Sequence, residues 1–249
     1  MPRPPRVVDG GLVYHVLNRA NARMTIFETD GDYQAFEEII ADARQRIGTR
    51  LLAYCVMPNH WHLVVWPRVV GELSDFVGWL TLTHTQRWHA HRGSTGSGHV
   101  YQGRFKSFPI ESDEHLFTVC RYVERNPLRA GLVRAAEDWR WGSLRRRVHG
   151  NAAQRALLSD WPSVLPRGWL RMVNEPQTAA ELSAVREAVL RGRPYGGENW
   201  VHQTVARLGL EITLRPRGRP RKHASIGKGS CTFSPAKHWL GDAATTPTK

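Results

Sequence analysis

Residues 50 to 68 have the sequence RLLAYCVMPNHWHLVVWPR, in which a Pro-Asn dipeptide separates two β-rich runs. Because Pro-Asn is typical of turns, the two runs are expected to be neighbouring antiparallel strands. His60 and His62 are two residues apart, so both project from one face of the second strand while Trp61 projects from the other. Two adjacent imidazoles suit a metal site; the alternative is a pair of histidines that only form hydrogen bonds on a solvated sheet face.

On both sides of this pair, apolar residues recur with the period of a strand or of a helix. Strands are expected at residues 11–19 and 100–112, the first with Val13, His15 and Leu17 on one face. Helices are expected at residues 32–47, 72–92 and 113–127. The order β, α, β, β, α, β, α predicts an α+β fold in which helices pack on an antiparallel sheet, similar in order to the ferredoxin-like plan.

The helix expected at residues 113–127 carries the candidate reactive side chains. Its apolar stripe, which we expect to be buried, consists of Leu116, Val119, Cys120 and Val123. Tyr122 and Asn126 are four residues apart, so they are expected to share the face opposite this stripe, and Arg125 and Arg129 can extend it. A hydroxyl nucleophile, a neutral oxygen ligand and two cations suit phosphodiester chemistry. The alternative is a surface helix with an ordinary exposed tyrosine.

The composition indicates an intracellular protein that binds a polyanion. There are 35 Lys and Arg residues against 22 Asp and Glu residues, a formal net charge of +13, and a nucleic acid is the favoured partner. The three cysteines have no CxxC spacing, which argues against a disulfide framework or a cysteine zinc site. With neither a signal peptide nor a run of about 18 apolar residues in view, we expect a soluble, cytoplasmic protein without a membrane partner.

The sequence changes character after residue 150. A helical hairpin is predicted at residues 178–191 and 198–208, and a basic segment, RPRGRPRKH, follows at 215–223. The last residues are rich in Gly, Thr, Ser and Pro and are expected to be disordered. The expected divisions are therefore a main domain at 1–150, a small helical region at 151–214 and a basic tail at 215–249.

Three segments, MPNHWHLVVWP, YQGRFKSFPIES and CRYVERNPLRAGLV, occur in this order and resemble the single-tyrosine HUH transposases of bacterial insertion sequences. More narrowly, they resemble the branch called REP-associated tyrosine transposases. YHVLNRAN near the start and GRPRK near the end extend the resemblance over most of residues 11–222. It implies a ferredoxin-like or RRM-like HUH nuclease core, in a protein associated with the bacterial nucleoid.

The resemblance also implies a set of site residues. His60 and His62 match the metal ligands, Tyr122 the nucleophile, and Asn126 the third ligand, where related enzymes more often have Gln. The implied cofactor is Mg²⁺ or Mn²⁺, although the histidines alone do not exclude Zn²⁺. No nucleotide cofactor is expected, because a phosphotyrosine conserves the bond energy. The implied partner is single-stranded or hairpin DNA, bound by a monomer or a homodimer.

Basic residues in two regions are candidates for contact with DNA. Arg104, Lys106, Arg125 and Arg129 can bind phosphates, although solvated surface cations are the alternative. The residues Arg217, Gly218, Arg219 and Pro220 are similar to the core of an AT-hook, with a generic basic tail as the alternative. For the whole protein, the alternatives to a transposase are an HUH replication initiator or relaxase, and a DNA-binding regulator with a vestigial site.

Overall fold

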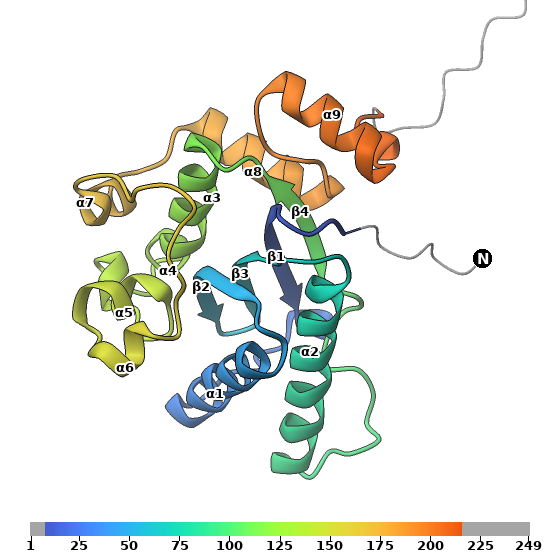
Figure 1. Ribbon diagram of the computed structural model, residues 1–249. Helices are drawn as coiled ribbons and strands as arrows, with labels where there is room; N and C mark the ends of the chain where they lie inside the picture. The colour runs from blue at the N-terminus through green and yellow to red at the C-terminus, as the bar shows by residue number, and fades with distance from the viewer. Residues whose placement is uncertain (1–7, 216–249) are drawn as a thin grey trace, which may run out of the picture. The chain divides into compact units, whose positions relative to one another are not determined.

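The two predicted runs form strands β2 (Arg50–Met57) and β3 (His60–Trp66), joined by the Pro58-Asn59 turn. They belong to a four-stranded antiparallel sheet with the order β2-β3-β1-β4, where β1 is Val13–Arg19 and β4 is Lys106–Ile110. The computed structural model describes residues 8–215, and Figure 1 shows helices on both faces of the sheet. The predicted α+β class and antiparallel sheet are confirmed.

Helices α1 (Asp30–Ile47) and α2 (Glu72–His91) cover one face of the sheet. A capping box between Thr29 and Asp32 begins α1, and Gly48, at φ 85°, ends it in the left-handed conformation that glycine adopts without strain. The apolar stripe of α1 packs against the strand residues that point to this side, including Trp61. The alternation in β3 therefore places Trp61 in this core and both histidines on the opposite face, as predicted.

Helix α3 (Glu114–Glu124) and the helices that follow it cover the other face. The predicted stripe of Leu116, Val119, Cys120 and Val123 is fully buried in this second core. The later helices are α4 (Asn126–Arg129), α5 (Ser143–His149), α6 (Ala152–Arg155), α7 (Trp169–Asn174), α8 (Ala179–Arg191) and α9 (Glu198–Leu208), with short 3₁₀ turns at Asn21–Arg23, Ala136–Asp138 and Glu211–Thr213. Of these, α5, α7 and α8 contribute buried side chains to the same core as α3.

Two predicted elements are shorter in the structure. The strand expected at 100–112 pairs with β1 only over Lys106–Ile110. Before it, the segment leaves the ladder, and pairing resumes only where Gln102 N donates to Arg19 O and Tyr101 forms an isolated bridge with Ala20. The helix expected at 113–127 ends at Glu124, and Pro127 lies in the first turn of the separate helix α4, consistent with its missing backbone N–H.

The expectation that Tyr122 and Asn126 lie opposite the apolar stripe is wrong. Both are only 8% exposed, and Tyr122 packs in the same core as Val119. At about 100° of rotation per residue, a side chain three positions from another on a helix lies only about 60° around the axis. Tyr122 is therefore on the flank of the stripe, facing the sheet rather than solvent.

Several predictions concern the ends of the chain. The AT-hook-like residues Arg217, Gly218, Arg219 and Pro220, and the disordered tail, lie outside the described residues. The division between 1–150 and 151–214 stays a prediction. No helix within residues 8–215 is long and apolar enough to cross a bilayer.

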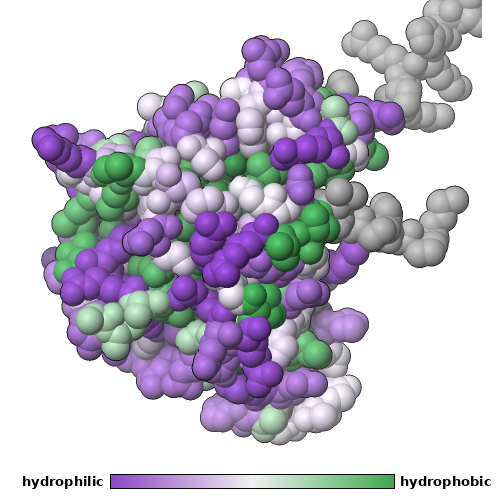
Figure 2. Space-filling model, viewed as in Figure 1, coloured by the Kyte–Doolittle hydropathy of each residue, from purple (hydrophilic) through white to green (hydrophobic). Residues whose placement is uncertain are grey.

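The face in Figure 2 is mainly hydrophilic, with small apolar patches between polar side chains, because the sheet and helices enclose most of their apolar side chains in the two cores.

Candidate active site

An open cleft of about 580 Å³ lies at the end of the sheet where β1 finishes and β3 begins. His60 and His62 on β3, Tyr122 on α3, and Asn126 and Arg129 on α4 all line it. The segment before β4 and one residue of α8 complete the walls. The structure thus brings together all four residues that the sequence predicts for metal binding and nucleophilic attack.

Tyr122 lies against the histidine pair. The centroid of its ring is 5.9 Å from that of His62, and the two planes meet at 84°. The ring of His60 is 5.0 Å from His62, again edge to face. The tyrosine and both histidines thus lie together within one folded chain.

His60 has a defined tautomer. Its Nδ1 is 2.6 Å from Asn59 Oδ1, and an amide oxygen can only accept, so the ring proton is on Nδ1. The Nε2 atom therefore carries the lone pair, as a metal ligand requires. Burial, with smaller contributions from Arg19 and Arg129, lowers the pKa of His60 to about 4. The imidazole is thus neutral at pH 7.

His62 is more deeply buried, at 4% exposure. Burial, and then the neighbouring His60 and His15, hold its pKa well below the ordinary value, so this ring is neutral too. Its Nδ1 lies 2.9 Å from His15 Nε2. His15 is fully buried on β1, and burial lowers its pKa to about 3. The sequence placed His15 on one face of its strand but not in the site.

Asn126 and Arg129 are linked to each other and to Tyr122. Arg129 donates to Asn126 Oδ1 at 2.7 Å and to the backbone oxygen of Tyr122 at 3.3 Å. Its guanidinium also lies over the Tyr122 ring, 4.2 Å from the centroid. The Asn126 amide nitrogen is buried and has no hydrogen-bond partner within the described chain.

The side chains of the cleft suit a divalent cation that accepts both nitrogen and oxygen ligands. The His60 imidazole offers an Nε2 lone pair, a second neutral imidazole, that of His62, lies beside it, and the Asn126 oxygen keeps a second lone pair beside the one that Arg129 uses. The unpartnered amide nitrogen marks Asn126 as a polar group whose hydrogen bonding is incomplete in the protein alone. The role of Asn126 as a third ligand stays a prediction.

The cations predicted to bind DNA divide into two sets. Arg104, Lys106 and Arg129 line the cleft, and so does Arg19, which sequence reasoning missed. Arg125 does not: its guanidinium donates to the carbonyl oxygens of Val173 and Asn174 at the end of α7. The expectation that Arg125 extends the Tyr122 face is therefore wrong.

Residues 10–126 match the family model described as "Transposase IS200 like". Over this region the chain is similar to the IS200-like transposases. It is 25% identical over 141 residues to the REP-associated tyrosine transposase of Escherichia coli (strain K12), covering 57% of this chain and 81% of that protein. A solved structure of a REP-associated tyrosine transposase bound to a REP hairpin is similar over 72% of this chain and 99% of its own, with 18% identity and a TM-score of 0.48.

The IS200-like region contains the whole sheet and ends at Asn126. His60, His62, Tyr122 and Asn126 therefore all fall inside it. Arg129 and the C-terminal helices follow it in the chain, so their contribution to the cleft is a property of this protein beyond the matched region.

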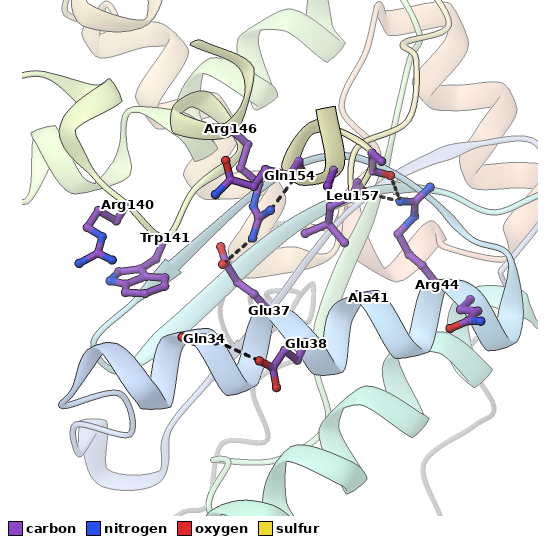
Figure 3. A pocket seen from close by; sticks show the side chains of 13 residues that line it. Gln34, Glu37, Glu38, Ala41, Arg44, Arg140, Trp141, Arg146, Gln154 and Leu157 are labelled. Carbon is purple, nitrogen blue, oxygen red and sulfur yellow. Dashed lines mark hydrogen bonds and ion pairs between the residues drawn. The ribbon is translucent and has the colours of Figure 1, made fainter. Parts of the chain in front are cut away.

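Two other features lie outside the cleft. A larger hollow, of about 770 Å³, lies between α1 and α6 (Figure 3). Its charged side chains already have partners: Glu37 pairs with Arg146, and Arg44 donates to Leu157 O. Glu111, Asp113 and His115 have ligand atoms within 4.8 Å of one another. Glu111 there accepts from Gly197 N, which ties β4 to the start of α9.

Proposed function

We propose that this protein is a transposase that cleaves and rejoins single-stranded DNA through a covalent 5′-phosphotyrosine bond to Tyr122, with a divalent cation as cofactor. The observation that carries the proposal is the position of the Tyr122 ring, 5.9 Å from His62 in a cleft that four cations line. A phenol, two neutral imidazoles and several guanidinium groups are together what phosphodiester transfer requires.

The DNA strand is held by Arg19, Arg104 and Lys106, whose charges face the cleft and bind phosphates without reading base sequence. The Tyr122 oxygen then attacks phosphorus in line. A tyrosine–phosphate bond forms as the bond from phosphorus to the 3′-oxygen breaks, and the products are a 5′-phosphotyrosine and a free 3′-hydroxyl. The phenol proton passes to water, and the departing oxygen takes up a proton.

Arg129 orients the nucleophile in this scheme. Its guanidinium stacks on the Tyr122 ring and bonds to the backbone oxygen of the same residue, so the ring and the helix end are held together. Since a misplacement of about 1 Å can cost about 100-fold in rate, this fixed orientation favours attack at one phosphorus.

His60, His62 and Asn126 would hold Mg²⁺ or Mn²⁺, which supplies charge withdrawal from the phosphate oxygens and stabilisation of the departing oxygen. Rejoining reverses the first step: a 3′-hydroxyl attacks the phosphotyrosine and releases Tyr122. The bond energy is retained throughout, so no nucleotide cofactor takes part.

The finer parts of the proposal concern the substrate and the assembly. A hairpin substrate is the part of the proposal that follows from the resemblance of the sequence motifs to the REP-associated tyrosine transposases, one of which is 25% identical over 141 residues. Catalysis within a single chain is supported by the contact between the rings of Tyr122 and His62 in the same chain. We therefore propose that a monomer can form a complete site. We further propose that the protein acts in the bacterial cytoplasm, where its DNA substrate lies.

The test is a cleavage assay on labelled single strands, with and without a hairpin, in the presence of Mn²⁺. The native chain is expected to form a covalent protein–DNA adduct that survives denaturation. Tyr122→Phe should abolish the adduct and keep DNA affinity within about threefold, because only the attacking oxygen is lost. An adduct that persists in Tyr122→Phe would refute the nucleophile.

His60→Ala tests the cation in the same assay. This variant keeps Tyr122 and should lose the Mn²⁺-dependent cleavage while retaining binding to the strand. Cleavage by His60→Ala at the native rate under limiting Mn²⁺ would exclude a metal role for the histidine pair. Binding of both variants without any cleavage by the native chain would instead indicate a regulator with a vestigial site.

A further inference from the structure

His15 contacts a proposed metal ligand from inside the core. It lies on β1, fully buried, and its ring is 5.1 Å from that of His62 with an angle of 27° between the planes. The register pairs Leu17 with His62, so His15 is the diagonal neighbour of His62 on the same sheet face. The distance from His15 Nε2 to His62 Nδ1 is 2.9 Å, that of a hydrogen bond.

Only one direction of this hydrogen bond leaves His62 able to bind a cation. Each neutral imidazole carries one N–H and one lone pair. If His62 donates from Nδ1, its Nε2 has a lone pair free for a ligand. If His15 donates instead, the proton of His62 is on Nε2, and no lone pair is free for a metal.

His60 shows the same arrangement with an unambiguous partner. Asn59 Oδ1 lies 2.6 Å from His60 Nδ1 and can only accept, so the His60 proton is on Nδ1. An acceptor at Nδ1 fixes the tautomer of a metal-binding histidine and raises its basicity. His15 Nε2 is in the corresponding position for His62, where burial keeps water from taking that role.

The unpaired ring nitrogen of His15 also indicates that this side chain serves as the acceptor for His62. When its Nε2 accepts, its proton is on Nδ1, and this atom is buried without a hydrogen-bond partner among residues 8–215. The ring packs against Phe108, with 4.9 Å between centroids. An apolar side chain would fill the same space with no unpaired polar atom, so packing alone does not account for a histidine here.

We propose that His15 is a positioning residue that accepts a hydrogen bond from His62 Nδ1 and so directs the Nε2 lone pair of His62 towards the cleft. This rests on the proposed metal-dependent function and adds a residue to it. His15 touches neither substrate nor cation and acts only through the tautomer and orientation of His62.

The first test uses the native chain without metal. Long-range ¹H–¹⁵N correlation spectra of ¹⁵N-histidine-labelled protein distinguish the two tautomers of His62. The expected state is the Nδ1–H tautomer for both His60 and His62. A native chain in which His62 is protonated on Nε2 overturns the proposal, whatever the variants do.

The second test is calorimetric titration with Mn²⁺ alone. His15→Leu removes the acceptor and should raise the Kd for Mn²⁺ by about 10- to 100-fold, as loss of an outer hydrogen-bond partner of a ligand does. His15→Gln places an amide oxygen near the same point and should restore the Kd to within about threefold of the native value. The matched control is His84→Leu, which removes a buried histidine from the other face of the sheet and should leave Mn²⁺ affinity unchanged.

The outcomes separate this inference from the function on which it rests. If the native chain binds Mn²⁺, His60→Ala abolishes binding and His15→Leu binds like the native chain, the role of His15 fails while the metal site stands. An equal loss in the Leu, Gln and His84 variants also overturns it, since only general stability would be at work. A native chain that does not bind Mn²⁺ refutes the metal site itself and the inference with it.

Discussion

Arg129 contacts two of the proposed reactive residues at once. One nitrogen donates to Asn126 Oδ1 and another to the Tyr122 backbone oxygen, while the plane of the guanidinium lies over the Tyr122 ring. Burial lowers the pKa of this guanidinium, but an arginine side chain stays charged at any pH that the protein survives. Only a planar group with several donors can make these contacts together, which a lysine ammonium cannot reproduce.

Arg129→Lys is therefore expected to lower the rate of covalent adduct formation by about 10- to 100-fold, because the ring of Tyr122 loses its fixed orientation. The charge is retained, so the affinity for single-stranded DNA should stay within about threefold. Single-turnover cleavage and fluorescence anisotropy measure the two quantities separately.

Arg104→Ala is the contrasting variant. Arg104 lines the cleft on the segment before β4, so its loss should weaken DNA binding and reduce the salt dependence of log Kd by about 0.7, the contribution of one phosphate contact on a single strand. An Arg129→Lys chain that forms the adduct at the native rate would show that Arg129 has no part in orienting Tyr122.

Local spacing predicts part of this site but not all of it. His60 and His62 share a face because strands repeat every two residues, and Tyr122 and Asn126 come together because helices repeat every 3.6. His15 and Arg19 join them only through the register of β1 on β3, across more than 40 residues of sequence. Nothing local tells Arg125 from Arg129 either, because the carbonyl oxygens that Arg125 binds come from α7.

At the scale of elements, a buried hydrogen-bond chain joins β3, α2 and the segment before β4. Trp61 Nε1 on β3 donates to the Tyr101 hydroxyl at 2.9 Å, and that hydroxyl forms a hydrogen bond of 2.8 Å with His84 Nδ1 on α2. Burial lowers the pKa of His84 to about 3, so this ring is neutral at pH 7. This chain anchors Tyr101 between β3 and α2 on the face of the sheet opposite the histidine pair.

The lowered pKa of His84 leads us to expect that the folded chain is less stable in acid. Its pKa is about 3 in the folded chain against the ordinary value of 6.5, so between these values the unfolded chain binds a proton that the folded chain does not. The free energy of unfolding should therefore fall as the pH drops from 6.5 towards 3. The contribution of one such group is at most about 1.4 kcal/mol per pH unit.

His84→Gln keeps an acceptor for Tyr101 but cannot titrate. Urea unfolding between pH 7 and pH 4 should show a shallower loss of stability in this variant than in the native chain. His91→Gln removes an exposed histidine from the same helix and should leave the slope unchanged. Identical slopes for the native chain and His84→Gln would show that His84 does not contribute to acid unfolding.

The sequence predicts a helix or strand correctly where the apolar residues of that segment repeat with the period of the element. The strand–turn–strand unit and the helices α1, α2, α8 and α9 lie close to their expected bounds. The strand before α3 is shorter because its length depends on the partner: the ladder with β1 stops at Leu17 and Lys106, and pairing resumes only at an isolated bridge between Ala20 and Tyr101. The pairing partner is a tertiary property that a strand's own sequence does not contain.

At the scale of the whole molecule, the sheet has a core on each face, and the two cores differ in which parts of the chain supply their side chains. The first core is formed mainly by the sheet, α1 and α2 within the IS200-like region, with Trp141 and Leu157 added from beyond it. The second core, on which the Tyr122 helix lies, also needs α7 and α8 from beyond that region. Trp169 of α7 additionally donates to the buried Glu124 at the end of α3, at 2.7 Å. The C-terminal helices thus hold the end of the helix that carries Tyr122.

Chains that end at Gly150 and at Leu214 should consequently behave differently. A chain ending at Gly150 loses Trp169, Val173 and Val185 from the second core; at about 1.5–3 kcal/mol for each buried side chain, this loss is comparable with the whole stability of a domain, about 5–15 kcal/mol. It should show no cooperative thermal unfolding and form no adduct. The chain ending at Leu214 keeps every residue of both cores and should unfold within a few degrees of the full chain and retain cleavage. A chain of residues 1–150 that unfolds cooperatively and forms the adduct would show that the catalytic domain is complete without the C-terminal helices.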